Sequence, residues 1–265
     1  MQTTTVRAFA PARVCLHTWV SDTGAPIAAL WAYADVGDEI RLSQGLSTVV
    51  TVSGEMADDF PPAERSAILD AVGRLGSGCR IKIDMTVRTA ASFSGITTRV
   101  AAALRGAGRL VGKEPYDTAH DLGFDYSSAL QPEAKLRTER GVESVKLPPL
   151  HAVLVDPTSD VADPTEADLA NGHVGSLPLW NSPAEFVAWL STQEGPNAET
   201  APENRPDIEE ALDELDLLPD CLIARVSGPG PGCFALFPDR FTADAAAMNM
   251  AALKPMWWVR SAALG

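Results

Sequence analysis

A loop with glycine at every second position, Gly228, Gly230 and Gly232, is well suited by its residue types to meet a ligand. Apolar runs at residues 221–226 and 233–237 flank it, so the loop is predicted to join two strands. Glycine permits a positive φ and lets another group approach the backbone, because no Cβ stands in the way. Two interpretations follow: a purely structural turn, or a loop that touches a ligand or a neighbouring functional loop.

The histidines and cysteines give little support for a metal site. The four histidines show no ligand spacing, and no two share a helical face: His17, His120, His151 and His173. The four cysteines form no CxxC pair and mostly lie in apolar runs: Cys15, Cys79, Cys221 and Cys233. We therefore expect buried free thiols in a reducing compartment.

Charge and hydropathy exclude several classes of function. The chain has 265 residues, a formal net charge of −14 and a sequence pI near 4.6. This acidity argues against general binding to nucleic acid, which needs a basic surface. No apolar run approaches the roughly 18 residues of a membrane span, and residues 1–7 hold no signal-peptide apolar core. We therefore expect a cytoplasmic protein that binds neither nucleic acid nor membranes, and the oligomeric state stays open.

The elements that must position these residues follow from periodicity and cap signals. Helices are predicted at residues 61–75, 97–110, 182–190, 208–217 and 242–253. Strands are predicted at residues 30–42, 80–87, 151–156 and 257–262, with a strand pair bent at Pro11 across residues 6–20. Ser182, with Glu185 three residues later, forms a capping box. The order of elements after residue 150 indicates an antiparallel sheet with helices on one face.

Several stretches, in order along the chain, resemble the motifs of GHMP kinases, the small-molecule kinases that include galactokinase, homoserine kinase and mevalonate kinase. Residues 227–237, SGPGPGCFALF, are similar to the family's third motif, which reads SGSGATCFALF in its 4-diphosphocytidyl-2-C-methyl-D-erythritol kinases. Residues 9–14, 34–38 and 257–265 resemble that branch's opening motif, the stretch after it and its last strand. The resemblance spans nearly the whole chain. It implies a two-domain α+β fold, with a ribosomal protein S5-like nucleotide-binding domain at residues 1–147 and a ferredoxin-like domain at residues 148–265.

The resemblance also implies a chemistry: ATP and Mg²⁺ phosphorylate a small-molecule hydroxyl in non-mevalonate isoprenoid biosynthesis. Residues 122–125, LGFD, are similar to the family's LGADVP motif, which places Asp125 at the catalytic aspartate. Arg13 stands where a PAKINL-like motif has lysine, and it could pair with Asp125. The implied phosphate-binding residues, among which Thr97 also contacts the metal, are Ser94, Gly95, Thr97, Thr98, Gly228 and Gly230.

The sequence departs from the family's pattern at the implied site. The family's phosphate loop, GLGGGSS, corresponds to residues 92–98, SFSGITT, in which one glycine of four, Gly95, remains. Ile96 replaces a glycine, and a β-branched residue at positive φ would be strained by roughly 1–3 kcal/mol. The family's Tyr/His pair for cytosine is missing, and either His17 or Trp19 could substitute.

Two functions therefore remain open. One is an ATP-dependent kinase that uses the residues above. The other is a catalytically inactive paralogue with a binding or regulatory role, in which the start of the helix at residue 97 is a plain N-cap at Ser94 or Thr97.

Overall fold

The computed structural model of the protein describes residues 4–76, 78–88, 93, 95–157, 169–170, 172–193, 205–228 and 231–265. The chain forms two compact units, each assembled from three segments. The first unit takes residues 1–12, 37–89 and 94–132, and the second takes residues 13–36, 90–93 and 133–265. The long strands β1 (Thr5–Val20) and β2 (Pro26–Gln44) contribute to both units. The division into domains at residue 147 stays a prediction.

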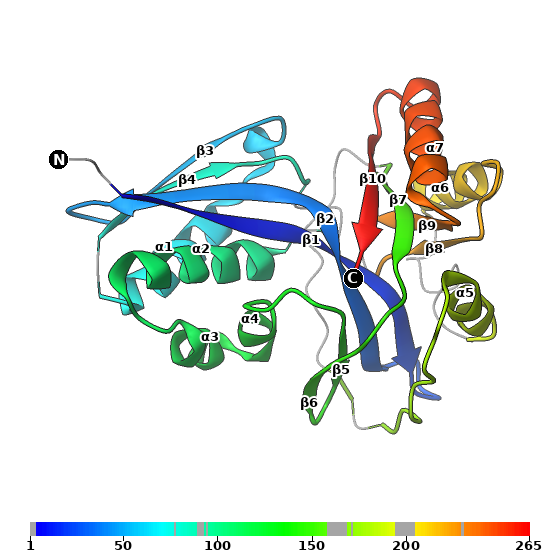
Figure 1. Cartoon of the computed structure of the whole chain (residues 1–265), viewed down its shortest axis with the longest axis horizontal. Coiled ribbons are helices and arrows are strands. Elements are labelled where there is room, and N and C mark those ends of the chain that lie inside the picture. The colour runs from blue at the N-terminus through cyan, green and yellow to red at the C-terminus, as the bar shows by residue number, and fades with distance from the viewer. Residues whose placement is uncertain are drawn as a thin grey trace. The chain divides into compact units, whose positions relative to one another are not determined.

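The first unit is a sheet with helices packed against one face (Figure 1). Strand β4 (Cys79–Asp84) pairs parallel with β3 (Val49–Ser53) and antiparallel with β2, which also pairs with β1. The helical elements are η1 (Ala57–Asp59), α1 (Pro62–Arg74), α2 (Ile96–Val111), α3 (Tyr116–Leu122) and α4 (Phe124–Ser128). The helices predicted at residues 61–75 and 97–110 are thus confirmed as α1 and α2.

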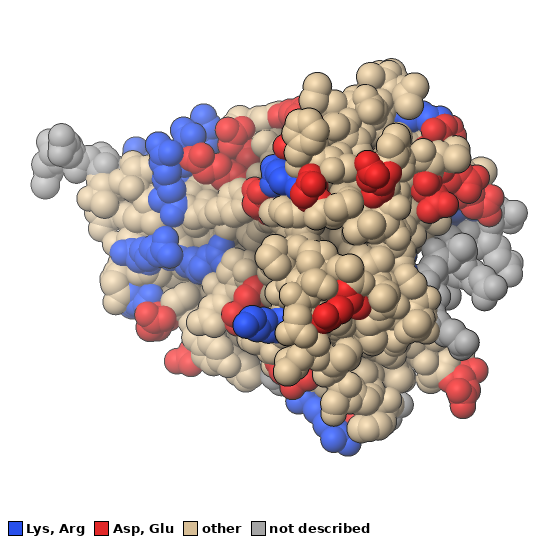
Figure 2. Space-filling view, turned by 45° about the vertical axis from the view of Figure 1, so that its right-hand side comes forward, with Lys and Arg blue, Asp and Glu red and all other residues tan. Residues whose placement is uncertain are grey.

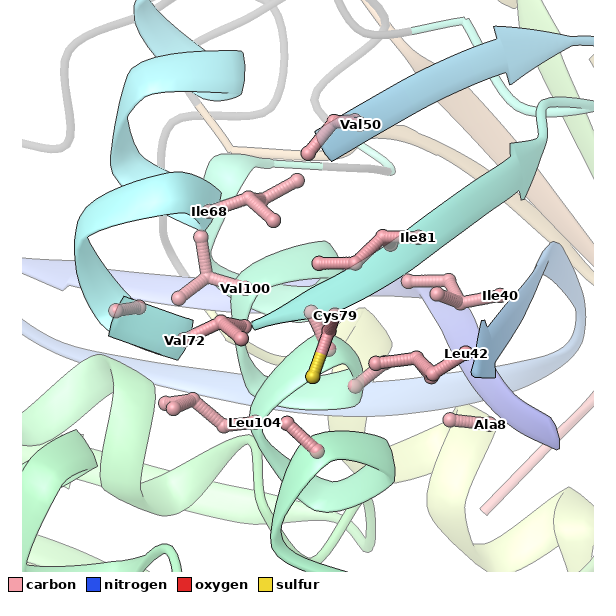
Figure 3. Packing of buried hydrophobic residues seen from close by; sticks show 14 of the residues in the cluster. Ala8, Ile40, Leu42, Val50, Ile68, Val72, Cys79, Ile81, Val100 and Leu104 are labelled. Atoms are coloured by element: carbon pink, nitrogen blue, oxygen red, sulfur yellow. The ribbon is translucent and has the colours of Figure 1, made fainter. Parts of the chain in front are cut away.

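The core of the first unit follows from alternation along the strands. Ile40 and Leu42 of β2, and Ile81 of β4, are buried, whereas the residues between them face away. Figure 3 shows these side chains beside those of α1 and α2, such as Val72. Small residues let α2 lie close to the sheet: a Cβ on Gly106 would fall 2.2 Å from Leu42 Cδ1.

The second unit contains an antiparallel sheet with two helices on one face, as the sequence predicted. Strand β10 (Trp258–Leu264) pairs with β7 (Leu150–Asp156), and β9 (Cys233–Phe237) lies between β7 and β8 (Ile223–Val226). Strands β5 (Lys135–Thr138) and β6 (Gly141–Ser144) form a hairpin beside β2. Helices α6 (Pro206–Asp216) and α7 (Arg240–Leu253) share one core with Val153, Ala235 and Val259.

Helix α5 (Pro183–Ser191) confirms the predicted cap. Ser182 Oγ accepts a hydrogen bond from Glu185 N at 3.2 Å. The Glu185 carboxylate in turn accepts one from Asn181 N at 2.8 Å, so the reciprocal bond falls one residue before the N-cap.

One expectation about the strands is wrong. Residues 6–20 do not bend at Pro11 into a strand pair, because β1 is one continuous strand. Pro11 has no N–H to donate, and β1 tolerates it because its ladder in the described part of the chain is with β2 alone.

All four cysteines are free thiols, as expected; Cys79 and Cys233 are buried, whereas Cys15 and Cys221 are half-buried. In the described ranges, no helix has the length and apolar character to cross a membrane.

Candidate functional site

The implied phosphate-binding stretch forms the start of α2, in the first unit. Gly95 is the N-cap, with extended backbone and no side-chain cap hydrogen bond. The first turn contains no acidic residue, so no carboxylate there opposes an anion at the helix N–H groups. A Cβ on Gly95 would meet Thr97 N as its nearest atom, at 3.8 Å. The positive end of the dipole of this 16-residue helix is therefore not offset by an acid in its first turn.

Two expectations for this stretch need correction. The N-cap is Gly95 rather than Ser94 or Thr97, and Ser94 itself lies outside the described residues. Ile96 is not strained, because the helix begins at this residue and gives it helical dihedral angles. Among the described non-glycine residues, positive φ occurs at Asp220 alone.

The hydroxyl groups of the first turn are largely buried. Thr97 is 7% exposed and Thr98 is 1% exposed. Thr98 Oγ1 donates a hydrogen bond to the Gly95 carbonyl at 3.3 Å, which holds this hydroxyl against the helix backbone. The implied contacts of these hydroxyls with phosphate and metal stay predictions.

A buried charged network, which the sequence interpretation missed, follows directly on this turn. Arg99 Nε donates to Asp38 Oδ2 at 2.6 Å, and Arg99 Nη1 contacts both Glu64 carboxylate oxygens at 2.9 and 3.1 Å. Arg99 Nη2 donates to the Val87 carbonyl at 2.9 Å. All three charged side chains are fully buried. The network therefore fixes the start of α2 against β2, α1 and the segment after β4.

Electrostatics within this network favour the charged arginine. Burial alone lowers the pKa of Arg99, but the attraction of Asp38 and Glu64, with their hydrogen bonds, outweighs it and raises the pKa. The sequence did contain a signal for this network: an arginine lies on the buried face of an alanine-rich helix. A buried charge of this kind needs a charged partner.

Asp125 lies in the first turn of α4, in the same unit. Gly123, with φ of 134°, ends α3 and is the N-cap of α4. Burial, and then the charges of Asp125 and Glu64, raise the pKa of the neighbouring Tyr126. The Asp125 carboxylate therefore stands beside a half-buried aromatic group, at the end of a helix that favours negative charge.

Arg13 belongs to β1 in the second unit, where it stacks on an aromatic ring. Its guanidinium carbon lies 4.2 Å from the centroid of Trp31, and that of Arg137 lies 5.8 Å from the same ring. A planar guanidinium stacks in this way better than an ammonium, which gives the replacement of lysine a physical basis. The pairing of Arg13 with Asp125 stays a prediction.

The glycine loop packs against the same strand as Arg13. Gly228 has a φ of 65°, and a Cβ on it would lie 3.4 Å from Cys15 Cβ. Ser227 Oγ accepts a hydrogen bond from Cys15 N at 3.0 Å, and Ser227 N donates to the Gly232 carbonyl at 2.7 Å. Close packing thus accounts for Gly228 as a structural turn. Gly230 lies outside the described residues, and ligand contact by this loop stays a prediction.

Gly228→Ala is expected to destabilise the protein by about 1–2 kcal/mol, because alanine at this positive φ is strained. Urea denaturation followed by circular dichroism measures the change. Gly24→Ala is the matched control, because Gly24 also has positive φ but an added Cβ there meets open space. Similar losses are expected in the two variants, and a much larger loss in Gly228→Ala would show that contact with Cys15, and not the positive φ, sets the cost.

The two residues proposed to replace the missing Tyr/His pair lie together in the second unit. The rings of His17 and Trp19 meet edge to face, with centroids 4.5 Å apart, and Trp189 lies 6.3 Å from each. Neither ring nitrogen of His17 has a hydrogen-bond partner in the described part of the chain. Burial, and then the charge of Arg225, lower the pKa of His17 to about 4, so the imidazole is neutral near pH 7.

The described residues hold no group of three or more His, Cys, Asp or Glu side chains that could bind a metal ion. A Mg²⁺ ion that arrives with phosphate oxygens needs only one or two protein ligands, so this finding is compatible with a nucleotide-bound magnesium.

Comparisons with known proteins agree with this architecture. Residues 189–254 match the family model described as "GHMP kinases C terminal". A 4-diphosphocytidyl-2-C-methyl-D-erythritol kinase from Dinoroseobacter shibae is 32% identical over 96% of this chain and 93% of its own length. One from Jannaschia sp. is 30% identical over 98% and 97%.

Solved structures show the same fold. The crystal structure of a 4-(cytidine 5'-diphospho)-2C-methyl-D-erythritol kinase superposes with a TM-score of 0.71 at 20% identity, covering 98% of this chain and 99% of its own. A homoserine kinase from Cytophaga hutchinsonii gives a TM-score of 0.62 at 18% identity, covering 97% and 94%. The two-domain α+β fold expected from the motifs is confirmed.

Proposed function

This chain belongs to the 4-diphosphocytidyl-2-C-methyl-D-erythritol kinase family of GHMP kinases. We propose that it transfers a phosphoryl group from ATP to a hydroxyl of 4-diphosphocytidyl-2-C-methyl-D-erythritol. The reaction would serve non-mevalonate isoprenoid biosynthesis. The observation that carries the proposal is the start of α2, a long helix with a glycine N-cap and no acid in its first turn. Four free thiols suit an enzyme of a reducing compartment such as the cytoplasm.

Each residue of the proposed mechanism has a separate task. The N–H groups after Gly95 hold phosphate oxygens, with Thr97 and Thr98 at the same turn. Asp125 orients the acceptor hydroxyl and receives its proton as the oxygen attacks. Arg13, held in orientation by Trp31, offsets negative charge that develops during transfer. Magnesium supplies charge neutralisation on the phosphates when it is bound.

The aromatic group of His17 and Trp19 is proposed to receive the cytosine. A flat ring can stack on Trp19 or Trp189, and a neutral imidazole with unpartnered nitrogens can donate or accept one hydrogen bond. These residues would then replace the Tyr/His pair that the resemblance led us to expect.

The test exchanges Gly95 for aspartate or asparagine. Both side chains are good N-caps and fit the open space, so both variants should fold with melting temperatures at or above that of the wild type. Aspartate alone adds a charge that repels phosphate. We expect Gly95→Asp to weaken Mg-ATP binding, measured by calorimetry, at least tenfold more than Gly95→Asn does. Equal affinities in the two variants would show that phosphate does not bind at α2.

One observation favours the second candidate function, a binding protein without phosphoryl transfer. Thr97 and Thr98 are almost inaccessible, and Thr98 is engaged by the Gly95 carbonyl. Single-turnover assays with saturating Mg-ATP separate the two functions. Product formation in the wild type supports the kinase, whereas substrate binding without turnover would leave the non-catalytic function.

A further inference from the structure

The sheet of the first unit has a basic region on the face opposite its helices. Ile40, Leu42 and Ile81 point into the core, so the residues that alternate with them lie on the other face. Arg41 of β2, with Arg80 and Lys82 of β4, are exposed there. Figure 2 shows Lys and Arg side chains over part of the first unit, at the left of the view, with Asp and Glu side chains beside them. This region stands out in a chain whose net charge is −14.

The register of the strands places like charges opposite each other. Arg41 is paired with Lys82, and two residues along the same two strands Glu39 is paired with Asp84. Directly opposed like charges destabilise an antiparallel pair, whereas opposite charges stabilise it. Arg41 and Lys82 are therefore an unfavourable direct pair, although Glu39 and Asp84 beside it attract Arg41.

The cations are only partly neutralised by the protein. Glu39 binds Arg41 Nε, and this contact raises the pKa of Arg41. Neither Arg80 nor Lys82 forms a salt bridge with any described residue. The positive charges of Arg80 and Lys82 thus remain available to an external anion.

These side chains line a concavity of about 290 Å³. Three cations, three hydroxyl-bearing residues and three apolar residues line it, and no carboxylate does: Arg41, Arg80, Lys82, Thr5, Ser43, Thr51, Leu42, Val49 and Ile81. The concavity is large enough for a diphosphate group. We propose that this concavity is a binding site for the diphosphate group of a small phosphorylated molecule, held by charge-assisted hydrogen bonds.

The site is distinct from the start of α2. Arg80 and Lys82 lie early in β4, whereas Val87, the residue that Arg99 contacts, follows the end of that strand. At about 3.3 Å per residue, Arg80 and Val87 are separated by roughly 20 Å of chain. The inference therefore does not rest on the proposed kinase activity.

The binding test uses the full chain, with inorganic pyrophosphate as the probe and inorganic phosphate as the single-phosphate comparison. Isothermal calorimetry at fixed ionic strength should show pyrophosphate binding more tightly than phosphate. Lys82→Glu should weaken the affinity for pyrophosphate at least tenfold. Arg74→Gln is the matched control, because Arg74 is an exposed arginine of α1 paired with Asp70, and it should leave the affinity within about twofold.

Two further results decide the inference. Loss of pyrophosphate binding in Gly95→Asp together with its retention in Lys82→Glu would place the anion at α2 and overturn the proposal. Lys82→Glu should also raise the melting temperature of the free protein, because it puts opposite charges across the Arg41 pair. Absence of pyrophosphate binding in the wild type would likewise overturn it.

Discussion

Asp125→Asn is expected to lower kcat for phosphorylation of 4-diphosphocytidyl-2-C-methyl-D-erythritol by about 10²- to 10⁴-fold, the usual loss when a positioned acid–base group is removed. Asparagine has nearly the same shape, so the first turn of α4 keeps its packing, but an amide cannot accept the proton of the attacking hydroxyl. Steady-state kinetics at saturating Mg-ATP measure the effect. Nucleotide affinity should change little, because the carboxylate is not proposed to hold phosphate.

Asp121→Asn is the matched control, because Asp121 is an exposed aspartate of α3 in the same unit. It should retain full activity. The titration of Tyr126 provides a structural readout: its pKa is raised by burial and then by Asp125 and Glu64, so removal of the Asp125 charge should lower it. A variant with the lowered tyrosine pKa and unchanged kcat would exclude Asp125 from the reaction without any question of misfolding.

Arg99→Leu is expected to lower the free energy of unfolding by about 3–5 kcal/mol, the cost of breaking a fully buried ion pair. The leucine leaves Asp38 and Glu64 buried without their cation, and it also removes the donor to the Val87 carbonyl. Urea denaturation followed by circular dichroism measures the loss. Because the network fixes the start of α2, nucleotide affinity should fall together with stability.

Two comparison variants separate burial from charge. Arg74→Ala breaks an exposed pair with Asp70 on α1 and should cost at most about 0.5 kcal/mol. Arg99→Leu combined with Glu64→Gln should recover part of the stability, because one of the two uncompensated carboxylates is gone. A loss in Arg99→Leu no larger than that in Arg74→Ala would show that the buried network contributes nothing to folding.

Sequence reasoning succeeded where local patterns determine structure. Alternation along residues 80–87 predicted β4, the glycine loop predicted the β8–β9 hairpin, and Ser182 with Glu185 marked the start of α5. The motifs predicted the fold that the solved structures confirm. Each of these features depends on residues close together in sequence, or on a whole-chain pattern.

The contacts that define the candidate site were not predictable in this way. Arg99 meets Asp38 and Glu64 across 61 and 35 residues of sequence, and charge alone does not say which carboxylates are its partners. The stacking of Arg13 on Trp31 depends on how β1 and β2 pair. Ile96 was expected to be strained because a family loop was assumed, whereas the helix begins one residue earlier than predicted.

The place of β10 in its sheet has a consequence for biosynthesis. This strand lies between β2 and β7 in the order of the sheet, with Leu264 opposite Ala34 and Trp258 opposite Asp156. The ribosome therefore synthesises β2 and β7 long before β10, the strand that pairs with both. The edges of β2 and β7 that β10 will occupy stay unpaired during that interval. Such edges invite pairing with other nascent chains. Translation speed and chaperone capture should thus affect the yield of this protein.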